Sequence, residues 1–258
     1  KATILVDPLD YPNFIKRFPE NVSAKKKYAI KAMKHITKYD ISITKWFEGV
    51  ENEEYSLRYG ENPQQKATAF INNNIFKQLS GEKKLSYNNL LDLDAALTIA
   101  YSTNSNKHIC TIVKHNIPCG ASIETSQIKS YTNALDGDPV SAFGGIVAFN
   151  KKVTSLSAKN LLNNFFEVVA APDFDGEALK ILKKRVNLRV LKVKKYKSKI
   201  EQRSIFAGML VQQANSKKST IKKVYGVNRL NNEKINFFSN VLKAVKSNAI
   251  AMFDQNSL

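Results

Sequence analysis

At the centre of the chain lies the stretch Cys110-Thr-Ile-Val-Lys-His-Asn-Ile-Pro-Cys-Gly120, which runs from apolar and β-branched residues into two titratable side chains. The residues up to Val113 suit a strand that is covered on both faces. The asparagine, proline and glycine that follow favour a turn, and we expect them to end the strand. Lys114 and His115 are therefore predicted to lie where this strand stops.

A cation and an imidazole at the end of a strand are candidate catalytic groups. Ligands in an open α/β sheet bind at the carboxyl ends of its strands, so Lys114 and His115 would be placed there for chemistry. The alternative is a structural role, in which the lysine is solvated and the histidine only forms hydrogen bonds. Spacing alone leaves both roles open.

The composition is that of a globular protein. With 258 residues and 43% hydrophobic content, the chain can bury the core of one large domain or of two small ones. No apolar run approaches the length of about 18 residues that spans a bilayer, and the first residues lack a signal-peptide pattern. Two cysteines, Cys110 and Cys119, make no disulfide framework and fit a reducing compartment. We therefore expect a cytoplasmic protein that is not bound to a membrane.

The formal net charge of +18 would suit a nucleic-acid partner. The basic residues occur in short runs scattered along the chain, at 25–27, 183–185, 194–195 and 222–223. Because no nucleic-acid-binding motif accompanies them, we expect no nucleic-acid binding, and a basic binding module stays the alternative. The excess positive charge would still attract anionic substrates.

The first quarter of the chain is predicted to be mainly helical. Residues 2–7 are expected to form a short strand, and Asp7-Pro8 is a good helix start. Apolar residues recur every three or four positions between Ser23 and Phe47, which predicts a long amphipathic helix. The acidic stretch 51–54 is typical of a linker, and we place a domain boundary after residue 50.

The next segment, Tyr55 to Gln65, is predicted to be extended and then to break into a Gly/Asn/Pro turn. Arg58 in this turn could clamp a phosphate or a carboxylate, or it could be an ordinary surface arginine. A strand at 66–71 is expected next, followed by a helix with Asn89 or Asp92 as its cap. The first amides of that helix would offer an anion site.

The rest of the chain alternates between predicted helices and strands. In chain order these are a helix at 123–135, a strand at 146–149 preceded by two glycines, a strand at 166–171, a helix at 176–184, a strand at 188–193, and a last helix with Ile235, Phe238, Leu242 and Val245 on one face. This alternation is typical of an α/β sheet with helical cover.

Zinc chemistry is the first alternative to test, because the chain has three histidines and two cysteines. Zinc-dependent nucleoside deaminases need Pro-Cys-x-x-Cys to supply two thiolates. Here Pro118-Cys119 is followed by Gly-Ala-Ser, so the second thiolate is absent. The sequence also has no Walker A loop, no dinucleotide-binding fingerprint and no nucleophile elbow. What remains is metal-free group transfer, or no catalysis.

Four sequence blocks form a pattern that the spacing of helices and strands does not explain. They are Ser56-Leu-Arg-Tyr-Gly-Glu-Asn-Pro63, Leu85-Ser-Tyr-Asn-Asn-Leu-Leu-Asp92, Val113-Lys-His-Asn-Ile-Pro-Cys-Gly120 and Asp138-Pro-Val-Ser-Ala-Phe-Gly-Gly145. In this order they resemble the bifunctional purine-biosynthesis family that joins AICAR transformylase to IMP cyclohydrolase. The resemblance covers nearly the whole chain.

The resemblance implies a fold, a reaction and partners. Residues 1–50 are similar to the C-terminal, helical tail of the cyclohydrolase domain, and residues 51–258 are similar to the N-terminal part of the transformylase domain, with a cytidine-deaminase-like, three-layer α/β/α fold. The implied reaction transfers a formyl group from 10-formyltetrahydrofolate, a co-substrate, to the 5-amino group of AICAR, without a catalytic metal. The full-length family also cyclises the product to IMP. A homodimer is implied, because transformylase sites of the family are built across a subunit interface.

The resemblance also carries over individual residues. Lys114 and His115 match the catalytic pair, in which His115 would accept a proton from the weakly nucleophilic AICAR amine while Lys114 stabilises the oxyanion and the leaving nitrogen. The positions that match substrate-binding residues are Arg58 and Tyr59 near the nucleotide, Asn89 at the carboxamide, Phe143 and Gly144 at the base, and Glu167 and Asn248 lining the pocket.

The chain departs from the family in two places. At Gln64, which corresponds to a substrate-binding position, an amide that cannot carry a charge replaces the family's histidine, so we expect reduced activity. The segments that follow Asn248 in the family are absent, and the chain is truncated at both ends relative to it. The alternative function is therefore a catalytically inactive remnant that binds nucleotide or a partner chain.

Overall fold

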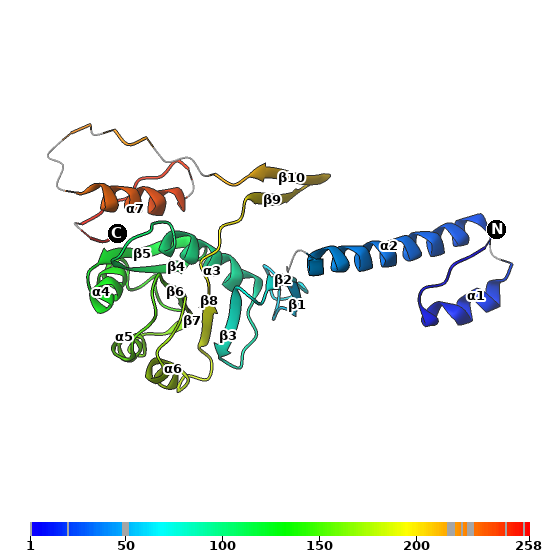
Figure 1. Cartoon of the computed structure of the whole chain (residues 1–258), viewed down its shortest axis with the longest axis horizontal. Coiled ribbons are helices and arrows are strands. Elements are labelled where there is room, and N and C mark those ends of the chain that lie inside the picture. The colour runs from blue at the N-terminus through cyan, green and yellow to red at the C-terminus, as the bar shows by residue number, and fades with distance from the viewer. Residues whose placement is uncertain are drawn as a thin grey trace. The chain divides into compact units, whose positions relative to one another are not determined.

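The computed structural model describes residues 2–19, 21–47, 52–215, 220–222, 224–225, 230–245, 247–254 and 256–258, and the side chains at 45, 46 and 52 lie outside this description. The chain divides into two compact units, Lys1–Glu53 and Glu54–Leu258 (Figure 1). The boundary expected after residue 50 lies among residues 48–51, outside the described residues. No described helix is both long enough and apolar enough to cross a membrane.

The first unit is built from helices. Its elements are the 3-10 helix η1 (Pro8–Asp10), α1 (Tyr11–Arg17) and α2 (Val22–Phe47). The long helix predicted from Ser23 is thus confirmed, and Asp7 caps the expected helix start by accepting a hydrogen bond from the Leu9 amide at 3.0 Å. The strand expected at 2–7 is wrong, because these residues have no regular secondary structure and pair with no described strand.

The second unit is organised around a six-stranded mixed sheet (Figure 1). In spatial order its strands are β3 (Phe76–Ser80), β8 (Arg189–Val193), β7 (Phe166–Ala171), β6 (Gly145–Phe149), β4 (His108–Lys114) and β5 (Ile117–Glu124). Two smaller two-stranded sheets are formed by β1 (Asn52–Ser56) with β2 (Thr68–Asn72) and by β9 (Ile200–Ile205) with β10 (Gly208–Gln213). The described part of the expected 51–54 linker therefore belongs to a strand.

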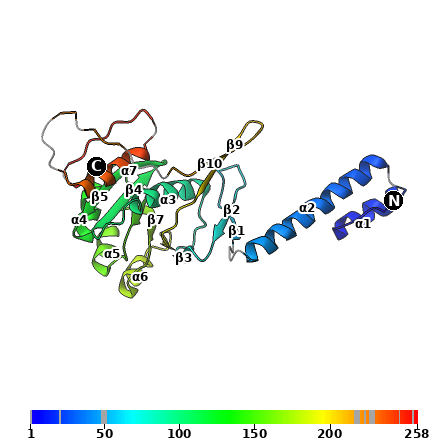
Figure 2. The same cartoon turned by 45° about the horizontal axis from the view of Figure 1, so that its top comes forward.

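Helices cover both faces of the large sheet, so this unit has three layers (Figures 1 and 2). On one face lie α3 (Tyr87–Ala100) and α7 (Asn232–Lys243), and on the other lie α4 (Gln127–Gly137), α5 (Ser155–Leu161) and α6 (Gly176–Leu182). The alternation of side chains along β4 supplies both cores, since Ile109 and Val113 face the first layer while Cys110 and Ile112 face the second. The prediction of a strand buried on both faces is confirmed.

Strand direction changes in the middle of this sheet. The strand β4 is antiparallel to both β5 and β6, whereas β6, β7 and β8 are mutually parallel. The carboxyl end of β4 therefore lies beside the amino ends of β6, β7 and β8. Lys114 is the last residue of β4, as predicted, so the end of β4 that carries Lys114 and His115 lies beside the starts of the parallel strands.

The turn after Lys114 is shorter than predicted. His115 and Asn116 alone connect β4 to β5, with positive φ values of 52° and 62°, as in the tight turns that match the twist of a hairpin. Pro118 and Gly120 lie inside β5 instead of ending the chain's extended run. Proline is tolerated because β5 is an edge strand with a bulge at this point.

The hairpin also corrects the element that follows it. The helix expected at 123–135 begins only at Gln127, because Ile123 and Glu124 still pair with β4. Gly120 permits α4 to pack closely, since a Cβ there would lie 1.7 Å from the carbonyl oxygen of Ala134. Both corrections arise from strand pairing, which local periodicity does not reveal.

Most other predicted elements are present. The strands near 66–71, 146–149, 166–171 and 188–193 and the helix at 176–184 are confirmed with small changes of their ends. Strands β3, β9 and β10 were not predicted. The last helix is confirmed as α7, but its buried face consists of Phe237, Phe238 and Val241, so of the four residues predicted for that face only Phe238 is buried.

Candidate active site

Lys114 reaches from the end of β4 to the turn in front of β6. Its half-buried ammonium donates a hydrogen bond to the carbonyl oxygen of Gly144 at 2.9 Å. Gly144 has a φ of +69°, and a Cβ at this position would lie 3.0 Å from the Lys114 Nζ. Glycine suits this position, because the backbone is left-handed and a side chain here would crowd the lysine.

Two aromatic rings lie beside this contact. The amide of Gly144 donates to the carbonyl of Phe165 at 2.7 Å, which joins the turn before β6 to the residues before β7. The rings of Phe143 and Phe165 are 5.0 Å apart, and both remain exposed. They form an apolar surface next to the Lys114 ammonium, of a kind on which a planar ring can pack.

His115 lies on the hairpin turn, and its side chain is exposed. The turn is held from below by α3, because the buried carboxylate of Asp92 accepts a hydrogen bond from the Asn116 amide at 2.5 Å. Among the described residues, the imidazole itself takes part in no hydrogen bond. The ring is therefore placed by the backbone of the turn and is open to a ligand.

The first turn of α3 lies under the site. Ser86 is the N-cap, and Asn89 is the third helical residue, so that the two side chains form a reciprocal capping box. The expectation that Asn89 or Asp92 would be the cap is wrong, because both stand inside the helix. One turn apart, they point to the same side, where Asn89 meets β7 and Asp92 meets the hairpin.

A buried polar cluster joins α3 to β7 and β8. The Asn89 side chain donates a hydrogen bond to Glu167 Oε2 at 2.9 Å. Arg189 Nη2 donates to the same oxygen and to Asn89 Oδ1, both at 2.8 Å. Burial raises the pKa of Glu167, but the hydrogen bonds from Asn89 and Arg189, together with the charges of Arg189 and Lys114, outweigh it and hold this pKa below its usual value. Glu167 is therefore an ionised hydrogen-bond acceptor, and the positive charge of Lys114 helps to keep it ionised.

The loop with Arg58 is bound to the start of α3. The Arg58 amide donates to the Leu85 carbonyl at 2.8 Å, and the Tyr87 amide donates to the Tyr59 carbonyl at 3.1 Å. The Arg58 guanidinium lies 5.0 Å from the centre of the Tyr59 ring and is exposed. The extended segment that breaks into a turn is confirmed, and its arginine is presented beside the helix that carries Asn89.

Gln64 and Gln65 differ in what they do in this loop. The Gln65 side chain accepts hydrogen bonds from the Asn62 amide at 2.7 Å and from its side chain at 3.2 Å, and its carbonyl accepts from Gly60 at 2.8 Å. Gln64 is exposed. The described contacts therefore assign loop structure to Gln65 and leave the Gln64 amide facing solvent.

The remaining candidate, Asn248, is exposed, and no described contact joins it to the residues around Lys114. Lys246, two residues earlier, lies outside the described residues. The structure therefore brings together Lys114, Phe143, Gly144, Asn89 and Glu167, places the Arg58 loop beside α3, and does not join Asn248 to them.

Three contributors to the site were not predicted from the sequence. Arg189 appeared only as one residue of an apolar run, Phe165 as the residue before a strand, and Asp92 as a helix cap. The one available signal was the arginine itself, since an arginine between Leu188 and Val190 in a buried strand must have an acceptor.

The two cysteine thiols are poorly suited to nucleophilic chemistry. Burial raises the pKa of the Cys119 thiol to about 11 and raises the pKa of the Cys110 thiol well above its usual value, so both are expected to be protonated and unreactive. Among the described residues, no group of three His, Cys, Asp or Glu side chains is arranged to share a metal ion.

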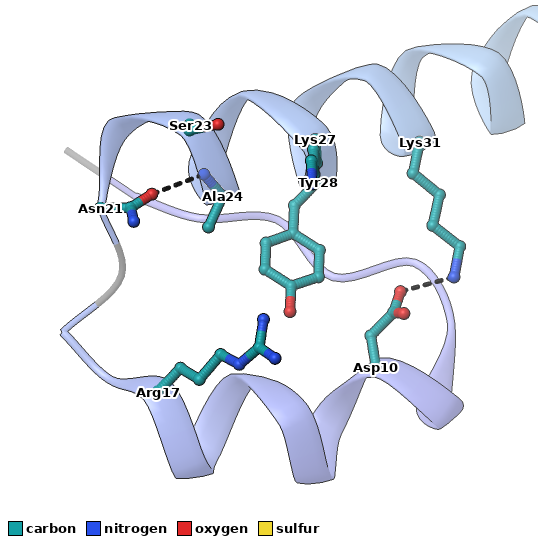
Figure 3. A pocket seen from close by; sticks show the side chains of 8 residues that line it. All are labelled: Asp10, Arg17, Asn21, Ser23, Ala24, Lys27, Tyr28 and Lys31. Carbon is teal, nitrogen blue, oxygen red and sulfur yellow. Dashed lines mark hydrogen bonds and ion pairs between the residues drawn. The ribbon is translucent and has the colours of Figure 1, made fainter.

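The first unit contains a separate hollow between α1 and α2 (Figure 3). Its lining residues are Asp10, Arg17, Asn21, Ser23, Ala24, Lys27, Tyr28 and Lys31. Lys31 pairs with Asp7 at 2.8 Å and with Asp10 at 2.6 Å, and Asn21 accepts a hydrogen bond from the Ala24 amide at 2.9 Å. These contacts stabilise the helix pair, and we assign this hollow no ligand.

Comparison with known proteins identifies the whole chain with one family. The family model described as AICARFT/IMPCHase bienzyme matches residues 1–258. The chain is similar to proteins named "Bifunctional purine biosynthesis protein PurH": it is 40% identical to those of Prochlorococcus marinus strains MIT 9312 and MED4, and 38% identical to that of Clostridium botulinum strain 657.

These matches cover 97%, 100% and 97% of the chain, but 55%, 56% and 54% of the respective relatives. The chain thus spans about half the length of the relatives it matches. The residues gathered around Lys114 come from the four blocks that carry the resemblance and from the strands between and after them. The chain therefore belongs to the AICARFT/IMPCHase bienzyme family.

Proposed function

We propose that the protein carrying this chain transfers a formyl group from 10-formyltetrahydrofolate to the 5-amino group of AICAR in purine biosynthesis. The contact between the Lys114 ammonium and the Gly144 carbonyl carries this proposal, because it unites the two family blocks that supply the catalytic pair and the base-binding segment. The exposed imidazole of His115 on the adjoining turn supports it.

The reaction can be assigned to these groups step by step. The AICAR nitrogen attacks the formyl carbon, and His115 accepts the proton that this nitrogen loses. The carbonyl oxygen becomes an oxyanion, which the Lys114 ammonium stabilises with the N–H groups that Gly144 does not use. The bond to the folate nitrogen then breaks, and that nitrogen takes up the proton that His115 accepted as tetrahydrofolate leaves. Lysine and histidine supply the charge and the base, so the proposed reaction uses no catalytic metal.

The surrounding residues suit the substrate. Ionised Glu167 and the Asn89 amide can bind the N–H and C=O groups of the carboxamide and amine, and the Phe143 and Phe165 rings can pack on the heterocycle. Arg58 and Tyr59 would face the phosphate side of the nucleotide. Asn248 and Gln64 are included as substrate-binding residues from the family pattern alone.

We further propose that residues 1–50 are the tail of the cyclohydrolase domain and that 51–258 are part of a cytidine-deaminase-like transformylase domain. The division of the chain into compact units at Glu53 and Glu54 supports the first assignment, and the three layers around a mixed sheet support the second. A cytoplasmic homodimer without nucleic-acid or membrane partners fits this function. A single monomer boundary in sedimentation at micromolar concentration would contradict the homodimer.

The proposal is tested by folate-dependent turnover. The protein that carries this sequence at the full length of its relatives is mixed with AICAR and 10-formyltetrahydrofolate, and the release of tetrahydrofolate and the formation of formyl-AICAR are measured. Both products should appear together, and both should require AICAR. A protein that binds AICAR without forming either product would contradict the proposal and favour a catalytically inactive remnant.

A further inference from the structure

Arg189 is an unusual residue for the interior of this sheet. Its side chain is 3% exposed at the start of β8, between Leu188 and Val190. It donates to the Asn187 carbonyl at 3.0 Å, to Asn89 and to Glu167, and its Nε is buried without a partner among the described residues. An apolar residue in place of a buried ion pair is often neutral or stabilising. Stability alone therefore gives a poor account of this arginine.

The arginine controls which way the Asn89 amide faces. The Asn89 Oδ1 accepts hydrogen bonds from the Ser86 amide at 3.1 Å and from Arg189 at 2.8 Å, while its amino group donates to Glu167. A flipped amide would direct N–H groups against both donors. Arg189 and Ser86 together therefore keep the amino group of Asn89 on the side of Glu167.

The arginine also determines which oxygen of Glu167 stays available. Arg189 and Asn89 both donate to Oε2. The other oxygen, Oε1, has no partner among the described residues, and the side chain is 34% exposed. Glu167 thus has one oxygen bound to the protein and one oxygen without a described partner, and the side chain lies close enough to Lys114 for that charge to lower its pKa.

We propose that Arg189 is a positioning residue of the transformylase site, which acts through Glu167 and Asn89 by fixing the orientation of the carboxylate, so that its Oε1 is ready to accept an N–H hydrogen bond from the amine or carboxamide of AICAR. This inference rests on the proposed function and assigns a role to a residue outside the four family blocks. Arg189 itself does not touch the substrate.

The test compares three variants in the protein at the full length of its relatives. Arg189→Met removes the donors and keeps much of the volume, and Arg189→Lys keeps a charge but loses the fork that reaches both partners. Arg185→Met is the matched control, because the described hydrogen bonds of the Arg185 guanidinium go to the main-chain carbonyls of Leu162 and Asn164. The measurements are kcat and KM for AICAR as a function of pH, and the melting temperature.

We expect Arg189→Met to weaken kcat/KM for AICAR roughly tenfold or more, the scale of losing one charge-assisted hydrogen bond. The acid limb of the pH profile of kcat/KM should move to higher pH in this variant, because without the arginine the Glu167 carboxyl is protonated more easily. Arg189→Lys should recover part of both effects, and Arg185→Met should change only the melting temperature. In a Glu167→Gln background, Arg189→Met should add little.

A lower melting temperature with an unchanged pH profile and unchanged kcat/KM in Arg189→Met would overturn the inference. If the wild-type protein neither binds nor formylates AICAR, the proposed function fails, and the positioning role is then tested without substrate. Carboxyl carbon NMR, with the Glu167 signal assigned through Glu167→Gln, should show a higher pKa in Arg189→Met. An unchanged Glu167 titration would overturn the inference whatever the activity.

Discussion

The cluster of Asn89, Glu167 and Arg189 and the turn of Lys114, His115 and Asn116 lie at the same end of the sheet, but they are held in different ways. In the cluster, side-chain hydrogen bonds of 2.8 to 2.9 Å decide the orientation of each group. In the turn, the left-handed backbone conformations of His115 and Asn116 determine the orientation of the side chains, and the imidazole remains exposed. One region positions its groups by partners, and the other positions them by backbone shape.

Because of this difference, substitutions in the two regions should affect activity and stability to different extents. Substitution of an exposed residue on the turn should change chemistry at little cost to folding, provided that the new residue tolerates a positive φ. Substitution of a residue that holds either region should reduce stability and activity together. The following predictions assume the protein at the full length of its relatives.

The largest effect is expected from His115→Asn. Asparagine tolerates the left-handed conformation that His115 adopts, with φ of 52°, so the turn should be kept while the proton acceptor is lost. We expect kcat to fall roughly 10²- to 10⁴-fold with little change in the KM for AICAR. Steady-state kinetics and thermal unfolding of one preparation measure both quantities.

His35→Gln serves as the control for this variant, since it removes another exposed imidazole, in α2, far along the chain from the turn. It should leave kcat unchanged. A His115→Asn protein with a lowered melting temperature and full turnover would show that the histidine is only structural.

Asp92→Ala should have the next largest effect. It removes the carboxylate that accepts from the Asn116 amide, and a hydrogen bond to a charged group contributes about 1.5–3 kcal/mol. We expect a loss of that order in the free energy of unfolding in urea, together with a lower kcat, because the turn is no longer held. Asp92→Asn, which keeps an acceptor, should lose less.

Asp136→Ala removes an exposed carboxylate from α4 and is the control for a general effect of charge. Equal destabilisation by Asp136→Ala and Asp92→Ala would argue against a specific role of Asp92 under the turn.

Arg58→Ala should affect binding in preference to turnover. Arg58 is exposed, and its guanidinium contacts the Tyr59 ring, so the melting temperature should change little. If it clamps the phosphate of AICAR, the KM should rise about tenfold with kcat nearly unchanged, because such a contact is the same in ground and transition states. The KM of Arg58→Lys should fall between those of the wild-type protein and Arg58→Ala. An unchanged KM in Arg58→Ala would show that Arg58 does not bind the phosphate.

The smallest effect is expected from Gln64→His, which restores the imidazole usual in the family. An exposed hydrogen-bonding group contributes about 0.5–1.5 kcal/mol, so the rate should rise roughly two- to tenfold. Gln65→Ala is the matched control, because Gln65 closes the loop through Asn62 and should lower stability without raising the rate. A Gln64→His protein with an unchanged rate would show that this position does not limit activity.

Much of this architecture was predictable from local pattern. Helical spacing predicted α2, α3, α6 and α7, and apolar runs predicted β4, β6, β7 and β8, because burial on a helix face or in a central strand leaves a periodic trace. The missed strands have weaker traces. The hairpin β9–β10 has exposed residues throughout both strands, and β5 contains a proline and a glycine that are usually turn signals.

The identities of the candidate site residues also came from the sequence, through Lys114, His115, Asn89, Phe143, Gly144 and Glu167. Their arrangement did not. The direction of β4 against β6 decides that the carboxyl end of one strand meets the amino ends of three others, and pairing between strands is a long-range property that no local window contains.

The clearest case is Arg189, which local pattern reads as one charged residue in an apolar strand. Its partners lie 22 and 100 residues away in the chain, at Glu167 and Asn89. A buried guanidinium requires hydrogen-bond acceptors, so the sequence alone indicates that Arg189 has acceptors in the fold. Only the folded sheet, which places the starts of β7 and β8 against the first turn of α3, decided which residues they are.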